Sequence, residues 1–189
     1  MKRYKKGQYG YRRYHRRVEI CKVAIGGALI LAQLLCRGLT DSEAARNILT
    51  VMAILSVLPV ANVASPLLAA WRYKTPTEEF YKKVLAYEEK GPVLYDLVIT
   101  SREALMPIDA LLVHPTGVYA YCTAKKLDQA KAEKFFKEMF TGHRLDIRVK
   151  LIFDERTFLN RLAGLKPRSE YEDDGSVDYA VTLLKSISM

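Results

Sequence analysis

The chain has 189 residues, half of them hydrophobic, which is enough for one modest domain and a further segment. Its net charge of +9 lies at one end: residues 1–75 carry 13 Lys and Arg against three acids, whereas residues 76–189 carry 17 basic and 18 acidic residues. The C-terminal part therefore has no overall positive field to attract a nucleic-acid backbone. The three widely spaced cysteines exclude a Cys-x-x-Cys metal pair and a disulfide framework.

The first predicted segment is a basic cytoplasmic tail over residues 1–17, which contains eight Lys and Arg and no acid. Because polybasic segments beside a membrane lie on anionic lipid headgroups, we expect this tail to do so. Arg16 and Arg17 are expected to anchor the following helix at that level. The tyrosines of the tail are interleaved with arginines, which leaves a second interpretation open: the rings stack on single-stranded nucleic acid.

An apolar run follows, and it is uncharged from Val23 to Cys36. That run alone is too short to cross a bilayer, but extending it back to residue 18 includes Glu19 and Lys22, which can pair one turn apart and reach the headgroups. We predict a membrane-spanning helix over residues 18–36. A signal peptide is the alternative interpretation, and it lacks a small-x-small cleavage site at the expected place.

The second apolar run has no charge from Ile48 to Ala70, which is roughly 34 Å of helix at about 1.5 Å per residue. A bilayer core is about 30 Å thick, so residues 48–71 are predicted to span it. The next residues supply aromatic and cationic anchors for a water interface. These predicted anchors are Trp71, Arg72, Tyr73 and Lys74.

Together the two runs predict a transmembrane helical hairpin over residues 18–72. The basic tail and the basic residues after the second run place both chain ends in the cytoplasm by the positive-inside rule. We therefore expect a multi-pass protein of the bacterial inner membrane, with the lipid bilayer as its first partner. Small residues such as Gly26 and Gly27 suit close helix packing, which also allows a homo-oligomer through the hairpin.

Residues 75–189 are predicted to form a small cytoplasmic α/β domain on a mixed sheet. Thr75 is the expected N-cap of its first helix, because Pro76 and Glu78 complete a capping box. The periodicity then predicts helices over 78–90, 127–142, 155–164 and 177–188, and strands over 93–100, 108–114, 117–122 and 146–154.

The hairpin of this domain carries a motif: Ile108-Asp109 opens one apolar strand, and Pro115-x-Gly117-Val118-Tyr119 opens the next. This run resembles the nuclease-related domain, a branch of the restriction-endonuclease-like fold, over about residues 91–162. The resemblance implies that fold, a divalent metal such as Mg²⁺ or Mn²⁺, and a site made of an Asp followed by Glu (or Gln)-x-Lys.

The chain departs from that pattern after its first residue. Asp109 matches the first position, but Cys122 stands where the second carboxylate belongs and Ala124 where the lysine belongs. Lys125 comes one residue late, and on a strand that places it on the opposite face. A neutral thiol does not replace an oxygen ligand of magnesium. The catalytic candidates are therefore Asp109 and Lys125, and Asp109 is the metal-binding candidate if the domain is a nuclease.

These observations favour a membrane protein whose cytoplasmic domain is a pseudoenzyme: a nuclease-like scaffold without catalysis or cofactor that binds a protein or nucleic-acid partner. Asp109 would then cap the strand or pair with a basic neighbour. Two alternatives remain open. In the first, the domain is a metal-dependent nuclease that takes its second carboxylate from Asp96 or Glu103. In the second, the transmembrane helical hairpin is a small oligomeric transport component.

Overall fold

The computed structural model describes residues 4–101, 105–124, 127–172 and 174–189. The chain divides into two compact units: one is Arg13–Arg72, and the other joins the residues up to Arg12 with Tyr73–Met189. We call them the helical unit and the α/β unit. The division differs from the predicted tail 1–17 and domain 75–189, because residues 4–12 belong with the sheet rather than with the helices.

The helical unit contains almost all of α1 (Tyr11–Leu39) and the whole of α2 (Glu43–Ala70). Both are long and apolar enough to cross a membrane, and the most apolar stretch of each is 0% and 6% buried. Both helices begin earlier than predicted, and α1 also ends later. Pro59 and Pro66 lie inside α2 without ending it.

Two contacts between α1 and α2 are described, one at a glycine and one between polar side chains. A Cβ atom added at Gly26 would overlap the side chain of Val60, so the two helices approach closely there. Further along, the Gln33 amide donates a hydrogen bond to the Ser56 hydroxyl at 3.4 Å. Gly27 has open space around it. The predicted small-residue contact is therefore made by Gly26 and not by its neighbour.

The α/β unit has the predicted order of elements. Its first helix is shorter than predicted and is capped by Thr77 rather than Thr75, because the Thr77 hydroxyl accepts from the Phe80 amide. The elements are α3 (Glu78–Leu85), β1 (Val93–Thr100), β2 (Leu105–His114), β3 (Gly117–Tyr121), α4 (Gln129–Gly142), β4 (Val149–Ile152), α5 (Glu155–Ala163) and α6 (Ser176–Ile187), with a 3₁₀ turn at Glu88–Lys90.

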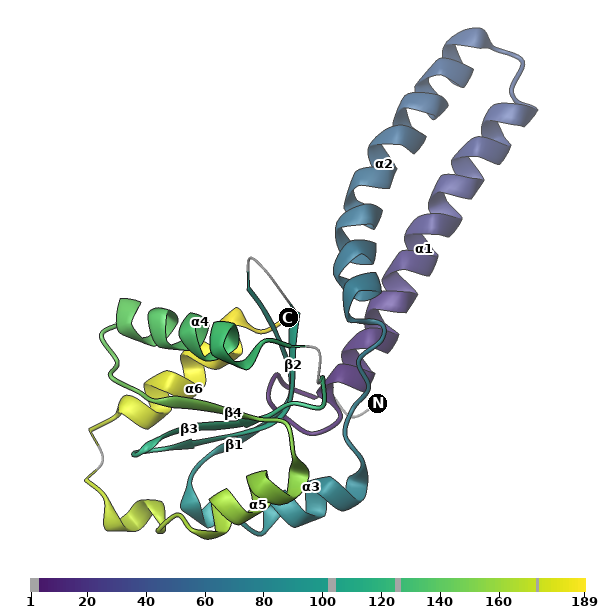
Figure 1. The fold of residues 1–189 in the computed structure, drawn as a ribbon. Coiled ribbons are helices and arrows are strands. Elements are labelled where there is room, and N and C mark those ends of the chain that lie inside the picture. The colour runs from purple at the N-terminus through teal and green to yellow at the C-terminus, as the bar shows by residue number, and fades with distance from the viewer. Residues whose placement is uncertain (1–3, 102–104, 125–126, 173) are drawn as a thin grey trace. The chain divides into compact units, whose positions relative to one another are not determined.

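The sheet is mixed, with strand order β1-β2-β3-β4. Neighbours are antiparallel from β1 to β3, and β4 is parallel to β3 because the chain crosses over through α4. Helices α4 and α6 cover one face, and α3 and α5 cover the other (Figure 1). The small mixed α/β domain predicted from the sequence is thus confirmed.

The N-terminal residues extend this sheet unit at its β1 edge. The Tyr95 amide donates to the Gly7 carbonyl at 2.9 Å, and Gly7 has a φ of 85°, which a residue with a side chain rarely adopts. The Lys6 ammonium donates to the Ser188 carbonyl at 2.5 Å, and the Tyr9 hydroxyl donates to the Pro76 carbonyl at 3.0 Å. The predicted tail is therefore folded up to Arg12.

The Gly26 contact leads to a prediction about helix pairing. We expect Gly26→Val to reduce the yield of a disulfide between cysteines placed at positions 33 and 56, because the added methyl groups push Val60 away. The measurement is oxidative cross-linking of the detergent-purified chain with Cys21 and Cys36 replaced by serine.

Gly27→Val is the matched control, because a Cβ there meets no atom within 4 Å. Its cross-linking yield should equal that of the parent. Equal yields in both valine variants would show that α1 and α2 do not pack through Gly26.

Candidate functional site

A break in strands β1 and β2 defines the centre of the α/β unit. Residues on either side of the break pair in one register, Tyr95 with Ala110 and Leu97 with Ile108, but Asp96 and Asp109 between them do not pair. Asp96 has a φ of 57°, outside the range of an extended strand. Two carboxylates therefore face each other across the sheet, which is unfavourable unless a cation separates them.

The same break shifts the alternation of the core side chains. In β1 the core under α4 and α6 receives Leu94 before the break and Leu97 after it. In β2 that core receives Ile108 before the break and Leu111 after it. A regular strand would place every second residue on one face. The backbone distortion at Asp96 and Asp109 thus keeps the apolar residues inside while turning two acids toward one point.

That point is occupied by the guanidinium of Arg12, whose side chain is 7% exposed. Its Nη2 donates to the carbonyls of Leu97 and Ile108, both at 3.1 Å. Its Nη1 donates to the Lys74 carbonyl at 2.6 Å and to Asp109 Oδ1 at 3.2 Å. Arginine fits because its planar fork offers donors in several fixed directions at once.

The Lys74 contact has a consequence for the chain path. Arg12 is the last residue before the helical unit, and Lys74 is the second residue after it. One side chain therefore holds together the two points of the α/β unit between which the helical unit is inserted.

Asp109 uses both of its carboxylate oxygens in protein contacts. Oδ1 accepts from Arg12, and Oδ2 accepts from the amide of Thr123 at 3.0 Å and from its hydroxyl at 2.7 Å. This fixes the segment after β3 against β2. The expected pairing of Asp109 with a basic neighbour is confirmed, and that neighbour comes from the N-terminal segment.

Asp96 is held less completely than Asp109. Its Oδ2 accepts from the Gly10 amide at 2.8 Å, and its Oδ1 lies 3.9 Å from Arg12 Nε, too far for a hydrogen bond. Burial raises the pKa of the Asp96 carboxyl above its ordinary value, although the charge of Arg12 opposes the rise. Burial therefore disfavours the charged form of Asp96.

The other predicted catalytic positions lie apart from this cluster or outside the described residues. Cys122 is fully buried in the core, and burial raises the pKa of its thiol to about 11, so it is uncharged at neutral pH. Ala124 packs on the same core. Lys125 and Glu103 lie outside the described residues. Within the described ranges, no three His, Cys, Asp or Glu side chains are grouped to hold a metal ion.

The predicted membrane anchors are partly brought together. The Arg16 guanidinium lies 5.5 Å from the centroid of the exposed Trp71 ring, a cation–π distance within the helical unit. Arg17 is exposed on α1. Lys74 contributes its carbonyl to the Arg12 contact, with its side chain exposed. Arg72 ends the helical unit and Tyr73 starts the second part of the α/β unit.

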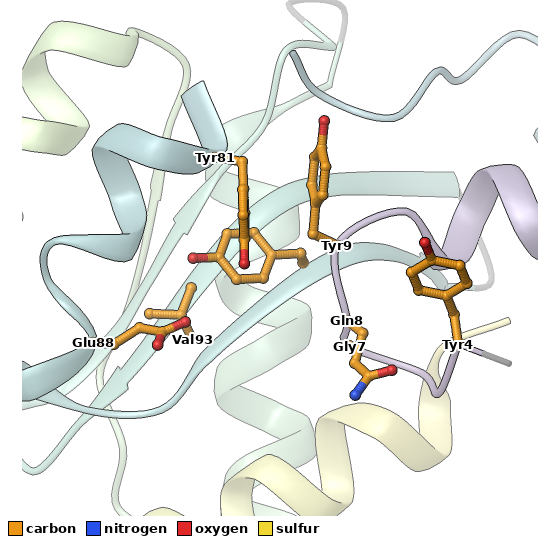
Figure 2. A pocket seen from close by; sticks show the side chains of 8 residues that line it. Tyr4, Gly7, Gln8, Tyr9, Tyr81, Glu88 and Val93 are labelled. Atoms are coloured by element: carbon orange, nitrogen blue, oxygen red, sulfur yellow. The ribbon is translucent and has the colours of Figure 1, made fainter. Parts of the chain in front are cut away.

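A pocket of about 530 Å³ lies on the α/β unit where the N-terminal segment meets α3 and β1. We call it the tyrosine pocket, and its main lining residues are Tyr4, Tyr9, Tyr81, Tyr95, Glu88 and Val93. Figure 2 shows Glu88 and Val93 at one end of it and Tyr4 at the other, with Tyr9 and Tyr81 between them. Its aromatic walls come from three separate parts of the chain.

Sequence reasoning missed both Arg12 and this pocket. In the sequence Arg12 is one of eight basic residues in a run, and nothing in that run distinguishes it from Arg13. Tyr9 was expected to stack on a nucleic acid or lie on lipid, but its ring stacks on Tyr81 with centroids 4.3 Å apart. A signal that could have found this contact is the presence of Gly7 and Gly10, which mark turns rather than a continuous helix.

Replacement of Arg12 is expected to destabilise the α/β unit. Both Arg12→Ala and Arg12→Lys should lower the free energy of unfolding by about 3–5 kcal/mol, the usual cost of removing one partner of a buried charge cluster. Lysine does not restore stability, because a single ammonium cannot reach four acceptors on different sides. The measurement is pulse proteolysis of the full chain in detergent over a urea series.

Arg13→Lys is the matched control, because Arg13 is the exposed neighbour of Arg12. It should unfold at the same urea concentration as the parent. An Arg12→Lys variant as stable as the parent would contradict the role assigned to the guanidinium fork.

The raised pKa of Asp96 predicts a pH dependence with a definite sign. The folded state binds the Asp96 proton more tightly than the unfolded state, so this residue stabilises the fold most when it is protonated. As the pH rises from the ordinary carboxyl pKa through the raised folded pKa, that contribution is lost. The unfolding free energy of the parent minus that of Asp96→Asn should therefore decrease as the pH rises.

Pulse proteolysis of both proteins between pH 4 and pH 7 measures this difference. Asparagine suits the test because it tolerates a positive φ and still accepts from Gly10. Asp146→Asn, at an exposed position, is the control and should show no such decline. If the parent became more stable relative to Asp96→Asn as the pH rose, the raised pKa of Asp96 would be contradicted.

Comparison of the chain with known protein families, with curated proteins and with solved structures finds no match in any of the three. The nuclease-related resemblance thus remains a prediction carried by the residues around Asp109.

Proposed function

We propose that this chain is a membrane-anchored binding protein. In this proposal α1 and α2 cross the bilayer as a hairpin, and the α/β unit is a non-catalytic module in the cytoplasm that binds a ligand in the tyrosine pocket. The observation that carries the anchoring is the exposure of large apolar side chains along both helices of the helical unit.

These side chains cannot remain in water at low cost. Among those exposed on α2 are Ile54, Leu55, Leu58 and Leu68, each at least 60% exposed. Soluble proteins rarely expose contiguous apolar patches beyond a few hundred Å². A core helix of a soluble protein would be mostly buried, which neither apolar stretch is. A bilayer is the environment that covers such a surface on all sides.

The proposed orientation rests on the charge of the flanking segments. Residues 4–17 and 72–74 carry basic residues and no acid, whereas Asp41 lies in the connection between α1 and α2 and Glu43 is the first residue of α2. Basic residues are retained on the cytoplasmic side of a membrane. Both ends of the helical unit would then face the cytoplasm, together with the α/β unit that they join.

The non-catalytic role is supported by the use of the two acids. In a nuclease of the resembling family, carboxylates at such a place hold a divalent metal. Here the guanidinium of Arg12 lies between Asp96 and Asp109 and supplies the positive charge that they require. Cys122, at the position of the missing carboxylate, is an uncharged buried thiol. These residues support the fold rather than a reaction.

Cysteine labelling in intact cells tests anchoring and orientation together. The background chain has Cys21→Ser, Cys36→Ser and Cys122→Ala, and it receives a single new cysteine as either Ser42→Cys or Asn160→Cys, both at exposed positions. A membrane-impermeant maleimide should label position 42 in intact cells and position 160 only after permeabilisation. Both proteins should stay in the membrane pellet after an alkaline carbonate wash.

Extraction of the protein by carbonate would overturn the anchoring. Labelling of position 160 in intact cells would overturn the orientation while leaving the anchoring in place. Metal-dependent cleavage of DNA or RNA by the purified full chain, lost in Asp109→Asn and retained in Thr123→Val, would replace the binding role with a nuclease.

A further inference from the structure

The walls of the tyrosine pocket are aromatic and arranged at angles to one another. The rings of Tyr9 and Tyr81 are stacked, with an interplanar angle of 16°. The Tyr95 ring is steeply inclined to both, at 84° to Tyr9 and at 69° to Tyr81, with centroids 6.4 Å and 5.0 Å away. Ring faces and edges therefore meet at a corner, an arrangement in which a positive charge can lie over a ring face.

A buried hydroxyl without a partner lies in this wall. Tyr95 is 3% exposed, and its hydroxyl oxygen makes no hydrogen bond with any described residue. A buried phenol usually finds a partner, because a buried hydroxyl without one loses its hydrogen bonds to water and gains none in return. The missing partner is explained if a ligand in the pocket supplies it.

The charge of the lining is negative. Glu88, at the start of the 3₁₀ turn after α3, is the acid among the lining residues. Burial is the main cause that raises the pKa of Tyr95, and the negative charge of Glu88 is the second cause. Among the described lining residues there is no Lys or Arg. A phosphate, a carboxylate or a nucleotide would therefore meet an acid and no compensating cation.

We propose that the tyrosine pocket binds a small molecule through its alkylammonium group, held between the Glu88 carboxylate, the Tyr95 hydroxyl and the tyrosine ring faces. An ammonium N–H donates to the Tyr95 oxygen and to Glu88, and the adjoining methylene groups pack on the rings of Tyr9 and Tyr81. This inference rests on the proposed binding role of the α/β unit and names the chemistry of its ligand.

The N–H groups distinguish this ligand from other occupants of an aromatic pocket. A neutral apolar molecule would satisfy the rings but leave the Tyr95 hydroxyl without a partner and Glu88 without a counter-charge. An alkylammonium supplies a donor for each oxygen and a charge for the rings. Hydrogen bonds to a charged group are the stronger ones, so these contacts favour the amine over its uncharged analogue.

The test uses n-butylammonium chloride as the probe and n-butanol as its uncharged analogue of similar length. The full chain, labelled with ¹³C in the tyrosine rings, is titrated in detergent at pH 7, and the ring signals are followed by NMR. We expect saturable shifts of the Tyr9, Tyr81 and Tyr95 signals with the amine, and no saturable shift with the alcohol.

Two variants test the assigned contacts. Glu88→Gln should weaken amine binding about tenfold, and Glu89→Gln, at the neighbouring acid that is not among the lining residues, should leave it unchanged. Tyr95→Phe removes only the unpartnered hydroxyl, so it should fold at least as stably as the parent and still bind the amine about tenfold more weakly.

Amine binding that is unchanged in Glu88→Gln, or equal binding of butanol, would overturn the inference, because the pocket would then have no preference for a cation. The absence of any saturable shift with the amine would overturn it as well. Neither result bears on the labelling of positions 42 and 160, so failure of the ligand assignment is distinguishable from failure of the membrane anchoring.

Discussion

The fold of the α/β unit depends on one buried guanidinium. Asp96 and Asp109 face each other where β1 and β2 do not pair, and without a cation their charges would repel in a region from which water is excluded. Arg12 places a positive charge between them and also donates to two strand carbonyls beside the break. The sheet therefore requires a residue from the other side of the helical unit.

This requirement joins the two pieces of the α/β unit, which are separated in the sequence by the helical unit. The N-terminal segment up to Arg12 adds a bridge to β1 and two tyrosine rings to the tyrosine pocket, and the carbonyl of Lys74 accepts from Arg12 in the second part of the α/β unit. The helices are thus an insertion between two pieces of one folded unit. The pocket is available only when the N-terminal piece is in place, because Tyr4 and Tyr9 come from it.

The sequence predicted those parts of the fold that follow from local patterns. Both long helices and the order of strands and helices follow from hydrophobic periodicity. Local patterns do not predict the positions of Arg12 and Tyr9, because these depend on contacts with residues more than 60 positions away. A run of arginines and tyrosines predicts a solvated tail, because the sequence does not show the residues that it contacts. The sequence spacing of Asp96 and Asp109 likewise does not indicate that they lie together.

Residues 4–12 are part of the α/β unit, and its strands depend on them. Hydrogen–deuterium exchange of the detergent-purified full chain, compared with a chain that begins at Arg13, measures this most directly. We expect amides of β1 and β2, above all Tyr95, whose amide donates to Gly7, to exchange much faster in the shortened chain. Equal protection of these strands in both proteins would contradict the account.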